Sequence, residues 1–229
     1  MNSTASPPLV SIVVRTMGRP SLARALAAVA AQTWRPLEIV LVDAAGAGIA
    51  MERHAGVPVR VAGKSALDRP RAANAGLVAA RGAWISFLDE DDEIDPAHVG
   101  SLVATATVAG LPVAYSQTRM IGADGAGRVF GGPFNREALL RSNYMAIHAV
   151  LFSRAFVDQG LRFDESFATF EDWDFWLQLA ARADFAFTGR PTAIYRAAAG
   201  SSGAGAGANL DREAVLAQRA RLMRKWQAA

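Results

Sequence analysis

Four acidic residues in a row follow an apolar stretch, and together they are the part of this sequence best suited to chemistry. The stretch at residues 84–88 predicts a buried strand, and the acids after it are Asp89, Glu90, Asp91 and Asp92. Adjacent carboxylates repel one another unless water or a cation neutralises them, and Mg²⁺ typically binds one or two carboxylates together with substrate phosphates. Alternate acids, Asp89 and Asp91, would lie at the carboxyl edge of the sheet, where open α/β sheets bind ligands. The alternative is a solvated acidic turn before a helix that starts at residue 96.

A second acidic pair, Glu171 and Asp172, lies much later in the chain among Phe170, Trp173 and Trp176. A carboxylate beside aromatic side chains tends to have a raised pKa and can then accept a proton, which suits a general base. The alternative is a plain helix start, because acids are favoured at helix N-termini.

Three predicted strands end at a residue that could serve a ligand: Thr16, Asp43 and Asp89. The ends of parallel strands converge on one cleft, so residues far apart in the sequence can share one site. Arg71 and Asn74 lie one turn apart near a helix start, where arginine and the helix N-terminus both favour an anion such as a diphosphate. The structural alternatives are a cap or turn acid for Asp43 and a solvated helix face for the other two.

The hydrophobic pattern places these residues on alternating strands and helices. The first half of the chain predicts a doubly wound parallel sheet, and the second half a more mixed arrangement. The strands are expected at 9–15, 37–43, 57–62, 84–88, 113–116, 149–152, 186–187 and 192–195, with a hairpin at 122–127. The helices are expected at 21–32, 70–80, 96–110, 135–141, 171–183 and 210–227.

The composition is that of a globular domain with no strong electrostatic partner. The chain has 229 residues, of which 52% are hydrophobic and 20% charged, and it contains no cysteine, which excludes disulfides and thiolate metal sites. A net charge of +3 is too small to indicate a nucleic-acid partner. No apolar run is long enough to span a membrane, and residues 1–8 do not read as a secretory signal. We therefore expect a cytoplasmic location.

These segments, in this order, resemble family-two glycosyltransferases, the inverting enzymes with the A-type nucleotide-sugar-binding fold. The resemblance runs from residue 10 to about residue 195, and its strongest part is the acidic run, which looks like the family's DXD motif. The segments that carry it are VSIVVRT at 10–16, QTW at 32–34, RAANAG at 71–76, FLDEDD at 87–92, FDE at 163–165 and EDWD at 171–174.

The resemblance implies an α/β fold with a Rossmann-like, mostly parallel central sheet flanked by helices and a smaller mixed region on the acceptor side. It implies a single domain over residues 1–229. Its parts would be a nucleotide-sugar-binding half at 9–110, an acceptor and catalytic-base half at 111–196, and a flexible loop with a C-terminal helix at 197–229.

The resemblance also implies roles for the candidate residues. Asp43 would contact the nucleotide base, while Arg71 and Asn74 would contact the nucleotide or its phosphates, beside Thr16. Asp89 and Asp91 would serve ribose, diphosphate and a Mg²⁺ or Mn²⁺ ion, with Asp91 as the likelier direct ligand. Asp172 would be the catalytic base. The implied reaction moves a sugar from a nucleotide-diphosphate donor to a saccharide or lipid-linked saccharide acceptor, in bacterial surface polysaccharide or glycolipid assembly.

Departures from the family pattern keep other interpretations open. Ala44 follows Asp43 where members often carry a second acid, and residues 196–202 contain no histidine, which many members place near the metal. These departures favour a catalytically degenerate binding or scaffold subunit as the main alternative. A sugar nucleotidyltransferase is a weaker one, because the turn at 16–20 has a single glycine.

Three further features have both a functional and a structural interpretation. The Ala/Gly/Ser segment at 197–208 is either a lid over the donor or a linker. His148 is either a sugar or acceptor contact or a structural residue, whereas we expect His54 and His98 at the surface. The C-terminal helix carries arginines beside an apolar side, which predicts docking on the domain and leaves peripheral contact with the inner face of a membrane open.

Overall fold

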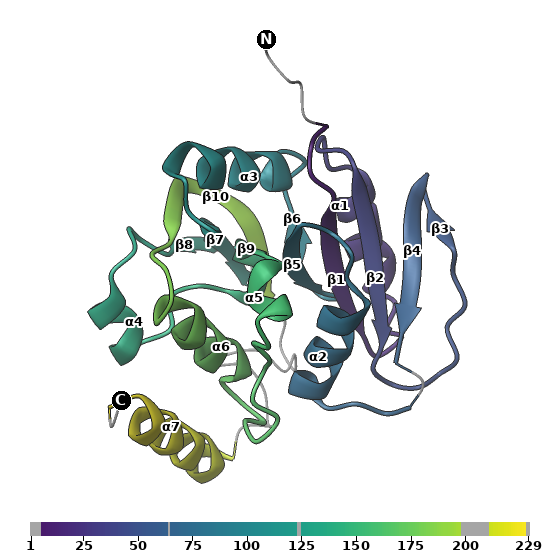
Figure 1. Cartoon of the computed structure of the whole chain (residues 1–229). Helices are drawn as coiled ribbons and strands as arrows, with labels where there is room; N and C mark the ends of the chain where they lie inside the picture. Colours follow the sequence, from purple (N-terminus) through teal and green to yellow (C-terminus); the bar gives the residue numbers. More distant parts are fainter. Residues whose placement is uncertain (1–5, 64, 123–124, 198–210, 228–229) are drawn as a thin grey trace.

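A computed structural model of the chain describes residues 6–63, 65–122, 125–197 and 211–227 (Figure 1). Its strands form one sheet in the order β3-β4-β2-β1-β5-β9-β7-β10-β6, with β8 paired to β7. The lid expected at 197–208 lies, apart from residue 197, outside the described residues.

The first half of the sheet is parallel, as the sequence predicts. β1 pairs with β2 and β5 in parallel, and β2 pairs with β4 in parallel. β1, β2 and β5 are buried along most of their length and rich in Val, Ile and Leu, the composition of strands covered on both faces. The bounds are Val10–Thr16 for β1, Leu37–Asp43 for β2, Val57–Ala62 for β4 and Trp84–Asp89 for β5; the short β3, Arg53–His54, pairs with β4 in antiparallel fashion.

The second half of the sheet is mixed. β9 lies antiparallel between β5 and β7, and β10 runs parallel to β7. The predicted hairpin is confirmed as the turn between β7 and β8, whereas the two short strands expected at 186–187 and 192–195 form one strand with an irregular register around Pro191. The bounds are Glu93–Ile94 for β6, Val113–Gly122 for β7, Gly127–Phe130 for β8, Val150–Ser153 for β9 and Ala186–Ala197 for β10.

Helices cover both faces of the sheet (Figure 1). Alternation along β1 directs Ile12 and Val14 to a core formed with α1 and α3, and Val13 to a larger core formed with α2, α5 and α6. The helix bounds are Leu22–Ala30 for α1, Arg69–Ala79 for α2, His98–Ala109 for α3, Arg136–Arg141 for α4, Ala155–Asp158 for α5 and Glu171–Ala180 for α6; a 3₁₀ turn spans Ile147–Ala149.

The C-terminal helix α7, Arg212–Gln227, docks on α6 and lies below it in Figure 1. Leu222 is fully buried, and both Lys225 and the indole N–H of Trp226 reach the buried carboxylate of Asp174, at 2.8 and 2.9 Å. Arg221 donates to the carbonyl of Ser166. The predicted docking is thus confirmed, and it turns part of the basic side of α7 toward the domain. Over the described residues, no helix has both the length and the hydrophobicity that a bilayer crossing requires.

Gly76 allows α2 to approach β1 closely, and this contact gives a stability prediction. A Cβ on Gly76 would lie 2.3 Å from Cγ1 of Val13, a β-branched side chain with little freedom to move. Gly76→Ala should therefore lower the free energy of unfolding by about 1–3 kcal/mol, the usual cost of overpacking, although alanine is the better helix former.

Gly100→Ala in α3 is the matched control for this measurement. Its Cβ would come no closer than 4.0 Å to Thr33 and Trp34, so the variant should be unchanged or more stable by up to about 1 kcal/mol. Urea unfolding followed by circular dichroism compares the two. Equal stability of the two variants would contradict the close packing of α2 on β1.

Candidate active site

The carboxyl ends of the central strands bring the predicted site residues to one edge of the sheet. Thr16 at the end of β1 pairs in register with Asp43 at the end of β2, and Arg15 pairs with Asp89 at the end of β5. Open α/β sheets bind ligands at this edge, so the side chains that lie there form the candidate site.

Arg15 holds Asp89 through a bidentate ion pair. Its Nε and Nη2 atoms donate to the two carboxylate oxygens at 2.7 and 2.8 Å, and Nη1 lies 3.4 Å from Oε1 of Glu171. The Arg15 side chain is only 8% exposed. Burial alone would raise the pKa of Asp89, but the guanidinium of Arg15 outweighs it and the pKa is lowered. Asp89 is therefore a fixed anion at near-neutral pH.

Glu90 and Thr16 form a hydrogen-bonded pair that holds the turn after β1. Thr16 donates its hydroxyl to Oε2 of the buried Glu90 at 2.5 Å, and the backbone N–H groups of Met17 and Arg19 donate to the same carboxylate at 3.1 and 3.0 Å. The structure thus gives Thr16 a part in shaping the turn after β1.

Asp91 is the member of the acidic run whose charge is least favoured. Its side chain is 32% exposed, and Arg19 lies 3.8 Å away. Burial, together with the negative charges of Asp92 and Asp89, raises its pKa. A bound cation would relieve this repulsion, because carboxylate oxygen is a ligand that hard cations prefer.

Asp92 faces inward toward a buried histidine. Nδ1 of His148 lies 3.1 Å from Oδ2 of Asp92, and the backbone N–H of Arg196 donates to Oδ1 at 3.2 Å. Burial lowers the pKa of His148, but Asp92, Asp89 and Asp91 outweigh it and the net direction is upward. His148 therefore acts as an internal partner of the acidic run.

His98 is also fully buried, so the expectation that it lies at the surface is wrong. Its Nδ1 is 2.7 Å from the hydroxyl of Thr192. Burial lowers its pKa to about 3, which keeps the ring neutral.

Asp43 organises a loop beside the site. It is 1% exposed and accepts the backbone N–H groups of Ala47, Gly48 and Ile49 at 3.1, 2.8 and 3.1 Å. Burial raises its pKa, but these hydrogen bonds outweigh burial and lower it. The carboxylate is thus turned toward the backbone of the loop that follows β2.

Arg71 and Asn74 connect α2 to a distant segment. Arg71 forms ion pairs with Asp68 at 2.5 Å and Glu165 at 3.2 Å. Asn74 exchanges hydrogen bonds with the backbone of Phe163, accepting at 2.9 Å and donating at 3.0 Å. The structure therefore directs both side chains toward residues 163–165.

Arg69, at the start of α2, is a second arginine, beside Arg15, whose charge acts on the acids of the site. It lowers the pKa of Asp89 and opposes the upward shift of Asp172. Neither Arg69 nor Arg15 was among the residues predicted for the site. In the sequence, Arg69 stands directly before Pro70, where a helix was expected to start. Arg15 is a charged residue in an otherwise buried apolar run, so it requires a partner of opposite charge.

Asp172 lies in the first turn of α6, partly exposed and close to these charges. Asn143 donates to its Oδ2 at 3.1 Å, and the backbone N–H of Trp173 donates to Oδ1 at 2.7 Å. Burial and the neighbouring charge of Glu171 raise the pKa of Asp172 to about 7. A carboxylate with this pKa can accept a proton at near-neutral pH.

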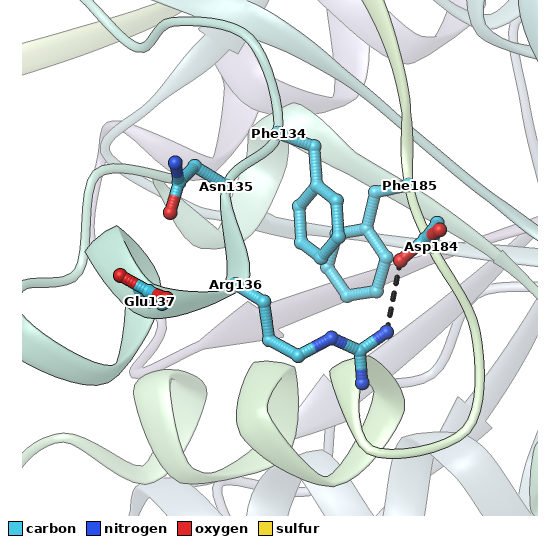
Figure 2. Close-up of a pocket in the computed structure, with 6 residues that line it drawn as sticks. All are labelled: Phe134, Asn135, Arg136, Glu137, Asp184 and Phe185. Carbon is cyan, nitrogen blue, oxygen red and sulfur yellow. Dashed lines mark hydrogen bonds and ion pairs between the residues drawn. The ribbon is translucent and has the colours of Figure 1, made fainter.

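A separate hollow of about 520 Å³ lies at the other end of α6. Figure 2 shows Phe134 stacked against Phe185 there, with Arg136 paired to Asp184 at 2.8 Å. Arg136 also donates to the carbonyl of Ala180, the last residue of α6, about 12 Å along the helix axis from Asp172. The candidate site is therefore the strand edge, where acids, arginines and a proton acceptor converge.

The comparisons with known proteins agree with this architecture. The chain matches the model of the family described as Glycosyl transferase family 2 over residues 11–156. This is more than half of the sequence, so the chain belongs to glycosyl transferase family 2.

One curated relative and several solved structures are similar to the chain. It is 29% identical over 187 residues to the succinoglycan biosynthesis protein ExoO of Rhizobium meliloti (strain 1021), covering 73% of this chain and 54% of that protein. The crystal structure of S. aureus TarS 1-349 superposes with a TM-score of 0.65 at 15% identity, covering 82% of this chain and 60% of that one. The same TarS portion has been crystallised with UDP, with a TM-score of 0.61 at 20% identity, covering 82% and 60%.

The structural matches confirm the expected fold, a large and mostly parallel sheet flanked by helices as in A-type glycosyltransferases. The chain spans little more than half the length of these relatives.

Proposed function

We propose that this chain is an inverting glycosyltransferase. It moves a sugar from a nucleotide-diphosphate donor to a hydroxyl group of a saccharide or lipid-linked saccharide, in the assembly of a surface polysaccharide or glycolipid. The observation that carries the proposal is a single site that combines carboxylates at the strand edge with a partly exposed acid whose pKa is about 7. Membership of the family, the similarity to a succinoglycan biosynthesis protein, and TarS structures described as complexes with UDP and UDP-GlcNAc support it.

Asp172 serves as the base in this proposal. As the acceptor oxygen forms a bond to the anomeric carbon, its proton passes to Oδ of Asp172, and the bond from that carbon to the diphosphate breaks on the opposite face. Attack opposite to the leaving group inverts the configuration. Asn143 holds the carboxylate in orientation through its hydrogen bond, which is how a positioned base gains efficiency.

The donor would lie along the strand edge. Arg69 provides a positive charge near Asp89 and Asp172 and suits the diphosphate. The loop anchored by Asp43 borders the nucleotide base, with Asp43 acting through the loop that it holds. Thr16 shapes the neighbouring turn, while Arg71 and Asn74 fix the segment that leads into α6.

A divalent cation fits this site through a small number of protein ligands. Within the described parts of the chain, no group of three or more His, Cys, Asp or Glu side chains could hold a metal, and both oxygens of Asp89 are already bonded to Arg15. The raised pKa of Asp91 marks it as the carboxylate that would gain most from a cation. Asp91, assisted by Asp89, would hold Mg²⁺ or Mn²⁺ together with donor phosphates. When bound, such an ion stabilises negative charge on the leaving diphosphate.

Thermal stability measured against a panel of nucleoside diphosphates, with and without Mn²⁺, tests the proposal. A ligand at 100 times its Kd stabilises the folded state by about 2.7 kcal/mol, which corresponds to a rise in Tm of roughly 5–10 °C for a domain of this size. One nucleotide should give a rise that depends on Mn²⁺. Hydrolysis or transfer of the matching nucleotide sugar then reports the reaction.

The panel also separates the proposal from the main alternative. A degenerate binding subunit would show the nucleotide-dependent rise with no sugar release from any donor. No rise with any nucleotide would contradict the proposed donor site.

A further inference from the structure

Arg15 links the two acidic regions of the site through one side chain. Three of its guanidinium nitrogens contact carboxylates from two distant parts of the sequence, Asp89 on β5 and Glu171 on α6. Nη1 also donates to the carbonyl of Arg69 at 3.4 Å, and the guanidinium lies 5.9 Å from the ring centre of Phe87. The side chain therefore has a fixed position beneath the site.

The groups that face Asp172 come from three elements packed around it. On its own helix, the charge of Glu171 disfavours ionisation of Asp172. Arg15 from β1 and Arg69 from α2 favour it, and so does the hydrogen bond from the backbone N–H of Trp173. Asn143, which precedes the 3₁₀ turn, contributes a neutral donor.

Arg15 is the one of these groups that contacts both acidic regions. Nη1 of Arg15 lies 3.4 Å from Oε1 of the buried Glu171, the residue immediately before Asp172, so the guanidinium is held beside the start of α6. Its own positive charge is held near Asp172 because Asp89 fixes its other side. The arrangement thus places a buried cation of constant charge between donor edge and base.

We propose that Arg15 is a positioning residue for the transfer reaction: it fixes Asp89 and Glu171 on two sides of one guanidinium and thereby controls the protonation of Asp172. The effect of Arg15 on sugar transfer rests on the proposed function, in which Asp172 is the base. The physical content of the inference, that the charge of Arg15 controls the protonation of Asp172, is independent of any donor or acceptor.

The test follows the side-chain carboxyl ¹³C signals of Glu171 and Asp172 by NMR as the pH is changed, in the wild type and three variants. Arg15→Met keeps much of the length of the side chain but removes its charge, so the midpoint of Asp172 should move to higher pH by on the order of one unit. Arg15→Lys retains a charge and should stay near the wild type. Glu171→Gln removes the repelling charge and should move the midpoint of Asp172 to lower pH.

A higher midpoint in Arg15→Met together with a wild-type midpoint in Arg15→Lys supports the proposal, because a role of Arg15 in packing alone would not depend on its charge. An unchanged or lowered midpoint in Arg15→Met would overturn it. Should Arg15→Met fail to fold, Arg15→Gln, which also removes the charge, takes its place, and an unmoved Asp172 midpoint there overturns the proposal. Absence of sugar transfer by the wild type with every donor would instead count against the proposed function, since the NMR titration requires no turnover.

Discussion

Asp172→Asn is expected to reduce sugar transfer by about 10²–10⁴-fold, the range that a positioned general base contributes. The amide cannot take the proton of the acceptor hydroxyl, although its oxygen can still accept a hydrogen bond from Asn143. Nucleotide binding should survive, because the proposed donor contacts lie on β1, β2, β5 and α2. The measurement is the transfer rate at saturating donor, together with the nucleotide-induced rise in Tm.

The pH dependence of the wild type belongs to the same prediction. Because the pKa of Asp172 is about 7, the transfer rate should rise with pH up to about that value and then level off. The contribution of Asp172 to the free energy of unfolding changes in the opposite direction and falls as the pH rises. A carboxyl whose pKa is raised on folding stabilises the folded state below its unfolded pKa, near 3.9, and this contribution is lost as the pH rises through about 7. At pH 8 Asp172→Asn should thus be no less stable than the wild type.

Asp158→Asn is the matched control for Asp172→Asn. Asp158 lies on α5, is largely exposed and pairs with Arg154 at 3.3 Å, away from the site. Its loss should leave transfer unchanged and stability within about 0.5 kcal/mol. A transfer rate for Asp172→Asn close to the wild-type rate would exclude Asp172 as the base.

The central strands could be predicted because their signal is local. β1, β2 and β5 are mostly apolar runs that each end at a polar residue, and the structure pairs them side by side so that these ends lie at one edge of the sheet. β10 was expected as two strands because Gly189 and Pro191 interrupt its pattern, yet pairing with β7 continues across the irregularity. Tertiary pairing thus overrode the local break.

The sequence could single out acids at the strand ends as candidates, but it could not identify their partners in the fold. Arg15 precedes Asp89 by 74 positions and Glu171 by 156, and no periodicity connects residues at such separations. For the same reason, the backbone groups that hydrogen-bond to Asp43 and Asn74 could not be identified from the sequence. The sequence indicates that a buried polar residue requires a hydrogen-bond or ion-pair partner, but only the folded structure shows which residue that partner is.

Asp91→Ala is expected to remove the Mn²⁺-dependent part of the nucleotide-induced stabilisation and to lower transfer by about 10²–10³-fold, the usual cost of losing one group that stabilises developing charge. The variant itself should be as stable as the wild type or more so. The pKa of Asp91 is raised by burial and by Asp92 and Asp89, so its removal relieves repulsion among like charges, most clearly above neutral pH.

Asp95→Ala provides the matched control, because Asp95 lies just beyond the acidic run and faces Arg119 at 3.9 Å. It should retain both the Mn²⁺ dependence and the transfer rate. Asp91→Ala and Asp172→Asn together distinguish two roles within one site. Asp91→Ala should lose metal-dependent donor binding, whereas Asp172→Asn should keep it. Equal loss of donor binding in both would contradict this division, since an acid that acts only as the base has no reason to hold the donor.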